Sequence, residues 1–381
     1  MMAKLGEVCK VSPSTKNIER QGAWLLNLDM VEQQTGRVIE YKYVGEDDLN
    51  GSIIQFDTEN VLYSKLRPNL NKVVLPPKDG FSTSELLPLR PDARVLNRDY
   101  LAVFLRSDSF VTWAVSKTAG AKMPRLGTKD LMNAEIPVPT IEQQKKIAEK
   151  FKKLEQLISL RKQQLAKLNE LVKARFVEMF GDCKTNPKNW KTKALEKIAN
   201  VGSSKRVFVE ELQDSGIPFY RGTEIGALAE KKAVIPALFI TEEHYKQLCE
   251  TTGKPQKGDL LMPSICPDGR IWIVDTDEPF YFKDGRVLWV HLTSANYNSV
   301  FLLYTLKDRI MTDYASIASG TTFAELKIFA LKKCKIFDVP LELQNQFANF
   351  VERVDQQKQT IQQSLEKLEL MKKALMQEYF G

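Results

Sequence analysis

The chain has 381 residues, which is long for a single domain, so we expect two or more domains. Hydrophobic residues make up 43% of the sequence, enough to form buried cores, and this excludes a largely disordered chain. Lysine and arginine (55) outnumber aspartate and glutamate (48), but the net charge of +7 is mild. It is compatible with a polyanionic partner such as nucleic acid without requiring one.

The five cysteines are scattered and include no Cys-x-x-Cys pair, so we expect neither a disulfide framework nor a metal site. The N-terminal sequence MMAKLGEVCK lacks the apolar core of a secretory signal. No apolar run approaches the ~18–20 residues that span a bilayer, so we expect no membrane association. These features predict a cytoplasmic protein.

The first segment, residues 1–138, mixes two kinds of pattern. Short β-branched or aromatic runs at residues 52–56 and 72–75 predict strands between turn-forming residues. Residues 99–117 predict a helix. We therefore expect an α+β domain here.

The next segment, residues 139–181, predicts one long helix. A proline precedes it and a glycine ends it, as is common at helix boundaries. Apolar residues recur every three to four positions, which is the coiled-coil pattern. The stripe includes Leu154, Ile158, Leu165, Leu168 and Val172.

Residues 182–338 form a second segment of mixed pattern. Residues 271–275 and 286–292 predict strands, and residues 241–250 and 298–318 predict helices. We expect a second α+β domain of similar size to the first.

The last segment, residues 339–381, repeats the long helix. Residues 344–381 match residues 144–181 without a gap, at an offset of 200 residues and with 12 of 38 positions identical. The second stripe includes Val354, Ile361, Leu365, Leu368 and Leu375. Each helix is too long to cover only its own domain, so we expect the two to pack against each other, antiparallel, as a pseudo-twofold repeat would require.

Both stripes are interrupted by charged residues, at Arg161 and Arg175 in the first helix and at Lys358 and Lys372 in the second. A charge on a helix seam is costly unless it lies at the edge or helps to set the pairing. We interpret these residues as possible determinants of partner and register.

The sequence carries no recognisable catalytic motif. The sequence has no GxxxxGK[ST] loop, no Asn-Pro-Pro-aromatic stretch and only two histidines, His244 and His291, without metal-ligand spacing. The chain is therefore predicted to be non-catalytic by itself.

Several stretches resemble the specificity (HsdS) subunits of Type I restriction-modification systems, and the similarity covers essentially the whole chain. They are residues 61–72, 81–86, 120–126, 180–182, 186–190, 217–225 and 257–261. The resemblance implies two target-recognition domains (residues 1–138 and 182–338) separated by two antiparallel coiled-coil spacer helices (139–181 and 339–381). The expected fold class is thus α+β with a pseudo-twofold internal repeat.

The resemblance also implies a role in DNA recognition. Such subunits read a bipartite, asymmetric site in double-stranded DNA, one half-site per domain, with the gap set by the helices. They dock two methyltransferase (HsdM-type) subunits and restriction (HsdR-type) subunits in a bacterial or archaeal complex that methylates adenine in DNA. S-adenosylmethionine, ATP and Mg²⁺ would belong to those partners, so no cofactor is expected on this chain.

Sequence reading needs side chains at base edges and cations at phosphates, because base contacts specify while phosphate contacts position. In the first domain one loop supplies cations, amides and a hydroxyl, and a second loop near Gly120 is basic. The candidates are Ser64, Lys65, Arg67, Asn69, Asn71, Lys72, Lys117, Lys122 and Arg125. The alternative for the first loop is a polar β-turn bent by Pro68.

In the second domain residues 263–270 replace the loop of residues 64–72 with a different sequence, so the two domains are expected to read different half-sites. The candidates there are Tyr220, Arg221, Thr223, Ser264, Arg270, Lys283, Arg286, Thr321 and Thr322. Two other functions stay open: a coiled-coil scaffold that does not read DNA, and the recognition part of a related bifunctional restriction enzyme.

Overall fold

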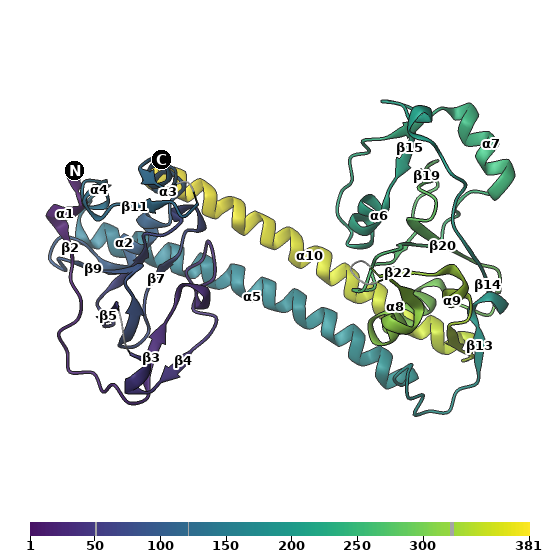
Figure 1. Cartoon of the computed structure of the whole chain (residues 1–381), viewed down its shortest axis with the longest axis horizontal. Coiled ribbons are helices and arrows are strands. Elements are labelled where there is room, and N and C mark those ends of the chain that lie inside the picture. Colours follow the sequence, from purple (N-terminus) through teal and green to yellow (C-terminus); the bar gives the residue numbers. More distant parts are fainter. Residues whose placement is uncertain (50–51, 121, 321–323) are drawn as a thin grey trace. The chain divides into compact units, whose positions relative to one another are not determined.

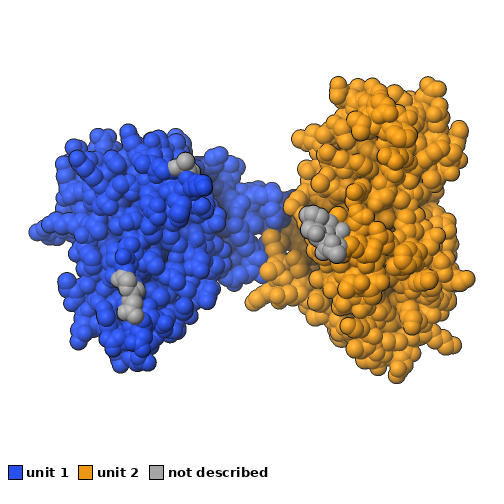
Figure 2. Space-filling view, viewed as in Figure 1, with its two compact units in different colours: residues 1–164, 361–381 blue, residues 165–360 orange. Residues whose placement is uncertain are grey.

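The computed structural model describes residues 1–49, 52–120, 122–320 and 324–381. It divides into two compact units, drawn in different colours in Figure 2. Unit 1 comprises Met1–Gln164 and Ile361–Gly381, and unit 2 comprises Leu165–Thr360. Each unit therefore contains part of both long helices. The division into four segments at residues 138, 181 and 338 stays a prediction.

Unit 1 is built on two four-stranded sheets (Figure 1). The first has the order β2-β9-β6-β7 and the second the order β4-β3-β8-β5. The strands are β2 (Cys9–Val11), β3 (Ala23–Leu26), β4 (Lys42–Val44), β5 (Ile53–Phe56), β6 (Val61–Ser64), β7 (Val73–Val74), β8 (Gly80–Thr83) and β9 (Leu86–Pro91). Two further pairs are β1 (Met2–Lys4) with β12 (Glu135–Pro137) and β10 (Thr118–Ala119) with β11 (Arg125–Leu126).

The helices of unit 1 cover the first sheet and complete the core. They are α1 (Leu5–Val8), α2 (Arg98–Leu105), α3 (Asp108–Ser116), α4 (Thr128–Met132) and parts of the two long helices. The sequence predicted one helix over residues 99–117, and this is wrong at Arg106–Ser107. There the Ser107 hydroxyl accepts a hydrogen bond from the Phe110 amide and begins a new helix.

Unit 2 repeats this plan with sheets of order β14-β20-β17-β18 and β16-β15-β19. Its strands are β13 (Thr192–Ala194), β14 (Ala199–Gly202), β15 (Ile217–Tyr220), β16 (Phe239–Ile240), β17 (Leu260–Pro263), β18 (Trp272–Ile273), β19 (Tyr281–Phe282), β20 (Val287–Leu292), β21 (Ala318–Ser319), β22 (Glu325–Leu326) and β23 (Lys335–Phe337). Its shorter helices are α6 (Gly222–Ala229), α7 (Glu242–Thr252), α8 (Ser299–Ile317) and α9 (Ile328–Lys332). The pairs β13–β23 and β21–β22 correspond to β1–β12 and β10–β11 of unit 1.

Within each unit the long helices α5 (Ile141–Phe180) and α10 (Leu341–Phe380) pack against each other in opposite directions (Figure 1). In unit 1 the Lys372 ammonium lies 2.8 Å from the Glu155 carboxylate, and the Lys150 ammonium donates a hydrogen bond to the Tyr379 hydroxyl. In unit 2 the Phe176 ring lies 5.5 Å from that of Phe347. The predicted fold class, with its antiparallel helices and internal repeat, is confirmed.

The predicted stripes lie on the inner sides of these helices. Four of their residues, Leu154, Val172, Val354 and Leu365, are buried. The other six are half-buried: Ile158, Leu165, Leu168, Ile361, Leu368 and Leu375. Half-burial is expected for a two-helix seam, since no third helix covers its edges.

The charged residues on the stripes are all half-buried and paired. Lys372 bonds across the helix pair to Glu155. Arg175 forms an ion pair with Glu178 of its own helix, and its guanidinium lies 5.9 Å from the centroid of the Phe350 ring on the opposite helix. Arg161 and Lys358 instead bond within their own helices, to Gln164 and Asp355. Lys372 and Arg175 therefore contribute to the pairing of the helices.

One glutamine anchors the start of each long helix. The Gln144 side chain is fully buried and accepts a hydrogen bond from the Asn97 amide at 2.8 Å. Its amide group donates to the carbonyls of Val95 and Pro139. Gln344, 200 residues later, is also fully buried and makes three equivalent bonds, to the Asn298 amide and to the carbonyls of Asn296 and Val339. Each glutamine thus joins its long helix to the loop before α2 or α8.

Unit 1 also contains a buried carboxylate. Asp57 is 1% exposed, and both of its carboxylate oxygens accept hydrogen bonds from Arg90 at 2.6 Å. Burial alone would raise the pKa of Asp57, but the hydrogen bonds from Arg90 and Ser14 outweigh it and lower the pKa to about 2.

We expect Asp57 to make unit 1 sensitive to acid. Because its pKa in the folded protein lies below the ordinary value of 3.8, its stabilising contribution is present above pH 4 and is lost as the pH falls towards 2. The free energy of unfolding, measured by urea denaturation between pH 5 and 2, should fall more steeply in the wild type than in Asp57→Asn. Equal slopes for the two proteins would contradict this assignment.

Candidate nucleic-acid interface

Three loops of unit 1 meet where β6 of its first sheet ends and β9 begins. They are the loop after β6 (residues 64–72), the turn between β8 and β9, and the β10–β11 hairpin. The Arg67 amide donates to the Pro124 carbonyl, and the Leu126 amide donates to the Lys65 carbonyl. The Lys65 amide in turn donates to the Glu85 carbonyl at 3.1 Å. The two basic loops predicted from the sequence are therefore brought together.

The cations of this loop cluster differ in their solvent exposure and in whether they form an ion pair. Arg67 and Lys122 are exposed, and the Arg67 guanidinium makes only a long contact of 3.5 Å with the Lys122 carbonyl. Lys65 is half-buried, Lys117 is exposed, and neither has an ion pair in the described part of the chain. Arg125 is bound to Glu85, with its Nη2 3.1 Å from the carboxylate.

The structure gives several predicted contact residues an internal role instead. Ser64 is 3% exposed and donates to the Leu66 carbonyl, while Asn71 is 7% exposed and donates to the Arg106 carbonyl. Burial lowers the pKa of Lys72, whose ammonium donates to the Leu28 carbonyl. We exclude Ser64 and Asn71 from the proposed interface because buried side chains cannot reach a groove, and we exclude Lys72 because its half-buried ammonium is bound to the Leu28 carbonyl. Asn69 remains exposed.

Unit 2 brings its own predicted loops together in the same way. The Lys283 amide donates to the Tyr220 carbonyl, and the Ser264 amide donates to the Arg286 carbonyl. The helix α6 lies against this cluster, with two glycines facing it. A Cβ on Gly226 would lie 3.0 Å from Arg270, and one on Gly222 would lie 3.4 Å from the Arg286 carbonyl.

The side chains of this second cluster again divide into exposed and internal. Arg221, Thr223, Lys283 and Arg286 are exposed, and Tyr220 and Arg270 are half-buried. Ser264 is 2% exposed and is therefore excluded from the proposed interface. Thr321 and Thr322 lie outside the described residues.

Acidic partners of the arginines were missed by the sequence analysis. Glu224 binds Arg221 at 2.6 Å, Asp268 lies 2.8 Å from Arg270, and Glu325 forms an ion pair with Arg286. Burial alone would raise the pKa of Glu224, but hydrogen bonds from Arg221 and Thr223 lower it to about 2, so this pair stays ionised at neutral pH. Glu224 follows Arg221 by three residues at a helix start, a spacing that could have indicated the pair.

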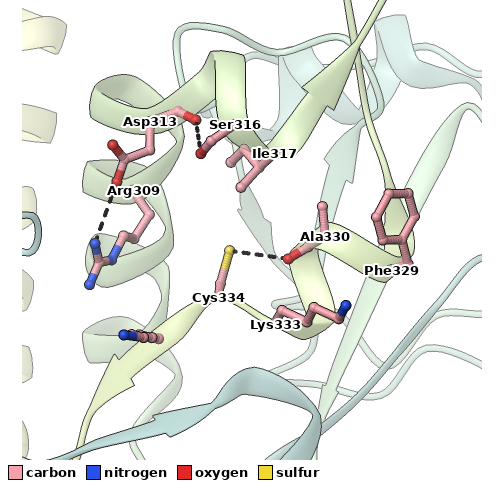
Figure 3. Close-up of a pocket in the computed structure, with 9 residues that line it drawn as sticks. Arg309, Asp313, Ser316, Ile317, Phe329, Ala330, Lys333 and Cys334 are labelled. Atoms are coloured by element: carbon pink, nitrogen blue, oxygen red, sulfur yellow. Dashed lines mark hydrogen bonds and ion pairs between the residues drawn. The ribbon is translucent and has the colours of Figure 1, made fainter.

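One open pocket of about 310 Å³ lies in unit 2 (Figure 3). It is lined by residues of α8, of α9 and of the segment that leads from α9 into β23, including Arg309, Phe329 and Cys334. None of its lining residues was predicted to contact DNA. Among the described residues there is no group of three or more side chains suited to hold a metal ion. Nor does any described helix combine the length and the apolar character needed to cross a membrane.

The comparison with protein families identifies the chain. The model of the Type I restriction modification DNA specificity domain matches residues 1–170 and again residues 187–370. The chain belongs to this family. The two matches fall on the two halves of the internal repeat, so each half carries one specificity domain.

Curated specificity subunits are similar to this chain over different shares of their length. The Type I restriction enzyme MjaVIII specificity subunit of Methanocaldococcus jannaschii is 24% identical over 323 residues, which cover 78% of this chain and 73% of that subunit. The Type I restriction enzyme EcoDI specificity subunit of Escherichia coli is 25% identical over 154 residues. That match spans 39% of this chain and only about a third (34%) of the EcoDI subunit.

Solved structures share the fold of this chain. The S subunit of a Type I restriction-modification system from M. genitalium has a TM-score of 0.60 at 15% identity, covering 100% of this chain and 96% of that one. A chain from a study of complex assembly and conformational transition of the type I R-M system has a TM-score of 0.61 at 18% identity, covering 100% and 97%. At this identity the likeness concerns the fold alone.

Proposed function

We propose that this chain reads a split, asymmetric site in double-stranded DNA, one half-site per unit. The observation that carries the proposal is that both units present an equivalent loop cluster with different side chains. In unit 1 the loop after β6 contains Lys65, Arg67 and Asn69. In unit 2 the corresponding loop, residues 264–270 after β17, has a single cation, Arg270. Two unlike half-sites can be read by loops that have the same backbone arrangement but carry different side chains.

The partners follow from the family and are part of the same proposal. Methyltransferase and restriction subunits would dock on the chain, and S-adenosylmethionine, ATP and Mg²⁺ would be bound by them. The chain itself would bind duplex DNA through exposed cations at phosphates, which makes the affinity fall with rising salt. Exposed apolar side chains on the long helices, including Leu157, Leu160 and Leu370, support the docking of a partner there.

The test is selection of DNA from a random library. The full chain, co-expressed with a methyltransferase subunit of a Type I system from the same genome, is incubated with duplexes that carry randomised bases, and the bound fraction is sequenced. We expect two enriched half-sites separated by a gap of unspecified sequence, about one helical turn (roughly 34–36 Å) between their centres. A coiled-coil scaffold that does not read DNA would enrich no sequence.

The role of the helices is tested in the same assay. Seven residues are inserted in each long helix where the chain passes between the units, after Gln164 and after Thr360. One heptad preserves the apolar stripe and adds about 10 Å, or roughly three base pairs, to the span. The half-sites should be unchanged and the gap longer. An unchanged gap, with both half-sites retained, would contradict the proposal that the helices set the spacing.

A further inference from the structure

An ion pair joins the hairpin to the neighbouring turn in both units. In unit 1 Arg125 of β11 binds Glu85, which precedes β9. In unit 2 Glu325 of β22 binds Arg286, which precedes β20. Neither pair was predicted from the sequence, because neither glutamate was among the candidate residues.

The two ion pairs occupy equivalent positions, as the backbone around them shows. The Lys65 amide donates to the Glu85 carbonyl, just as the Ser264 amide donates to the Arg286 carbonyl. The Lys65 carbonyl then accepts from Leu126, and the Ser264 carbonyl accepts from Leu326. In the strand registers Arg125 pairs with Ala119, and Glu325 pairs with Ser319. Position 85 therefore corresponds to 286, and position 125 corresponds to 325.

The positions of the arginine and the glutamate are exchanged between the two units. The arginine is on the hairpin in unit 1 and on the turn before the long central strand in unit 2. An ion pair that only held the hairpin in place would be equally effective with the arginine on either of the two segments. The exchange does, however, move the guanidinium from one loop to the other, so each unit presents its arginine from a different direction.

Each arginine is held and yet accessible. The Arg125 side chain is 45% exposed and Arg286 is 56% exposed, whereas Glu85 and Glu325 are 25% and 28% exposed. Glu85 accepts from Nε and Nη2 of Arg125, which leaves Nη1 without a hydrogen bond among the described residues. Glu325 accepts from Nη1 of Arg286. A guanidinium has five N–H donors, so each arginine keeps donors for a further acceptor.

We infer that Arg125 and Arg286 each read a base edge in the half-site of their own unit, with Glu85 and Glu325 as positioning residues. The inference rests on the proposed function. Arginine is suited to the two acceptors on the major-groove edge of guanine, O6 and N7. A carboxylate that already holds the guanidinium reduces the side-chain entropy lost on binding. The exchange then gives the two units different readings from the same framework.

The decisive experiment reverses one pair. The double variant Glu85→Arg/Arg125→Glu gives unit 1 the arrangement of unit 2, and the chain is used in the random-duplex selection with its methyltransferase subunit. We expect the base preference to change at one or more positions in one half-site only. The matched variant Arg286→Glu/Glu325→Arg should alter the other half-site only. Thermal unfolding of both variants reports whether the units remain folded.

A milder variant keeps the inference testable if charge reversal disturbs folding. Glu85→Gln retains the size and an acceptor oxygen but removes the charge, and it should reduce discrimination at the base read by Arg125 by about fivefold to tenfold, a part of what a bidentate contact provides. Arg125→Ala should relax the same position more strongly. Binding to non-specific DNA should be reduced far less than discrimination.

The outcomes separate the two proposals. If the wild-type chain enriches no sequence, the proposed function itself fails. If the wild type enriches a split site and the folded reversed variants enrich the same site with equal preference, the ion pairs are only structural and the inference fails. A change confined to the half-site of the altered unit supports it.

Discussion

Replacing Gln344 with leucine should lower the free energy of unfolding of unit 2 by roughly 2–4 kcal/mol, because the Asn298 amide and the carbonyls of Asn296 and Val339 each lose their hydrogen-bond partner. Leucine has no polar group, so the substitution removes all three hydrogen bonds at once. Urea unfolding followed by circular dichroism gives the overall change, and hydrogen exchange shows which unit is affected.

The matched control for this substitution is Gln346→Leu. Gln346 lies two residues along the same helix and is exposed, so the same replacement should change the stability by less than about 0.5 kcal/mol. Gln144→Leu should reproduce the large effect in unit 1. If Gln344→Leu were no more destabilising than Gln346→Leu, the anchoring role of the buried glutamine would be wrong.

Replacing Phe180 with alanine should destabilise unit 2 by about 3–5 kcal/mol, the usual cost of removing a buried phenylalanine ring. Phe180 is fully buried at the end of α5, and its ring lies 4.7 Å from that of Phe301 and 5.6 Å from that of Phe347. It therefore joins one long helix to the other and to α8. Thermal unfolding of the full chain measures the change.

Phe329→Ala supplies the matched control in the same unit. Its ring is 66% exposed and should contribute less than about 0.5 kcal/mol. Comparable losses for Phe180→Ala and Phe329→Ala would show that the aromatic cluster does not hold the helices together.

The long helices could be predicted because the sequence pattern that specifies them is local and occurs twice. An apolar residue every three to four positions indicates a buried stripe, and the 200-residue repeat indicates a second helix that can cover it. The two anchoring glutamines were visible as identical residues at the start of the repeat, but their burial was not. A glutamine at the surface and a glutamine bonded to three backbone groups look the same in sequence.

The loops could be predicted as loops but not in their orientation. Arg67 and Asn71 both adopt positive φ angles, 48° and 51°, and so the chain turns sharply on either side of Pro68. These turns direct Arg67 outwards and bury Asn71. Residue type alone cannot distinguish the two, because the direction of a side chain in such a turn depends on backbone torsion angles and on neighbouring strands.

Unit 1 takes its last structural elements from the opposite end of the chain. Met376 and Phe380 belong to its buried core, and the Ser109 hydroxyl donates to the Phe380 carbonyl. During synthesis on the ribosome, the core of unit 1 therefore cannot close until residues 361–381 have been made. A chain interrupted before residue 376 would contain every recognition loop of unit 1 and still lack part of the core that supports them.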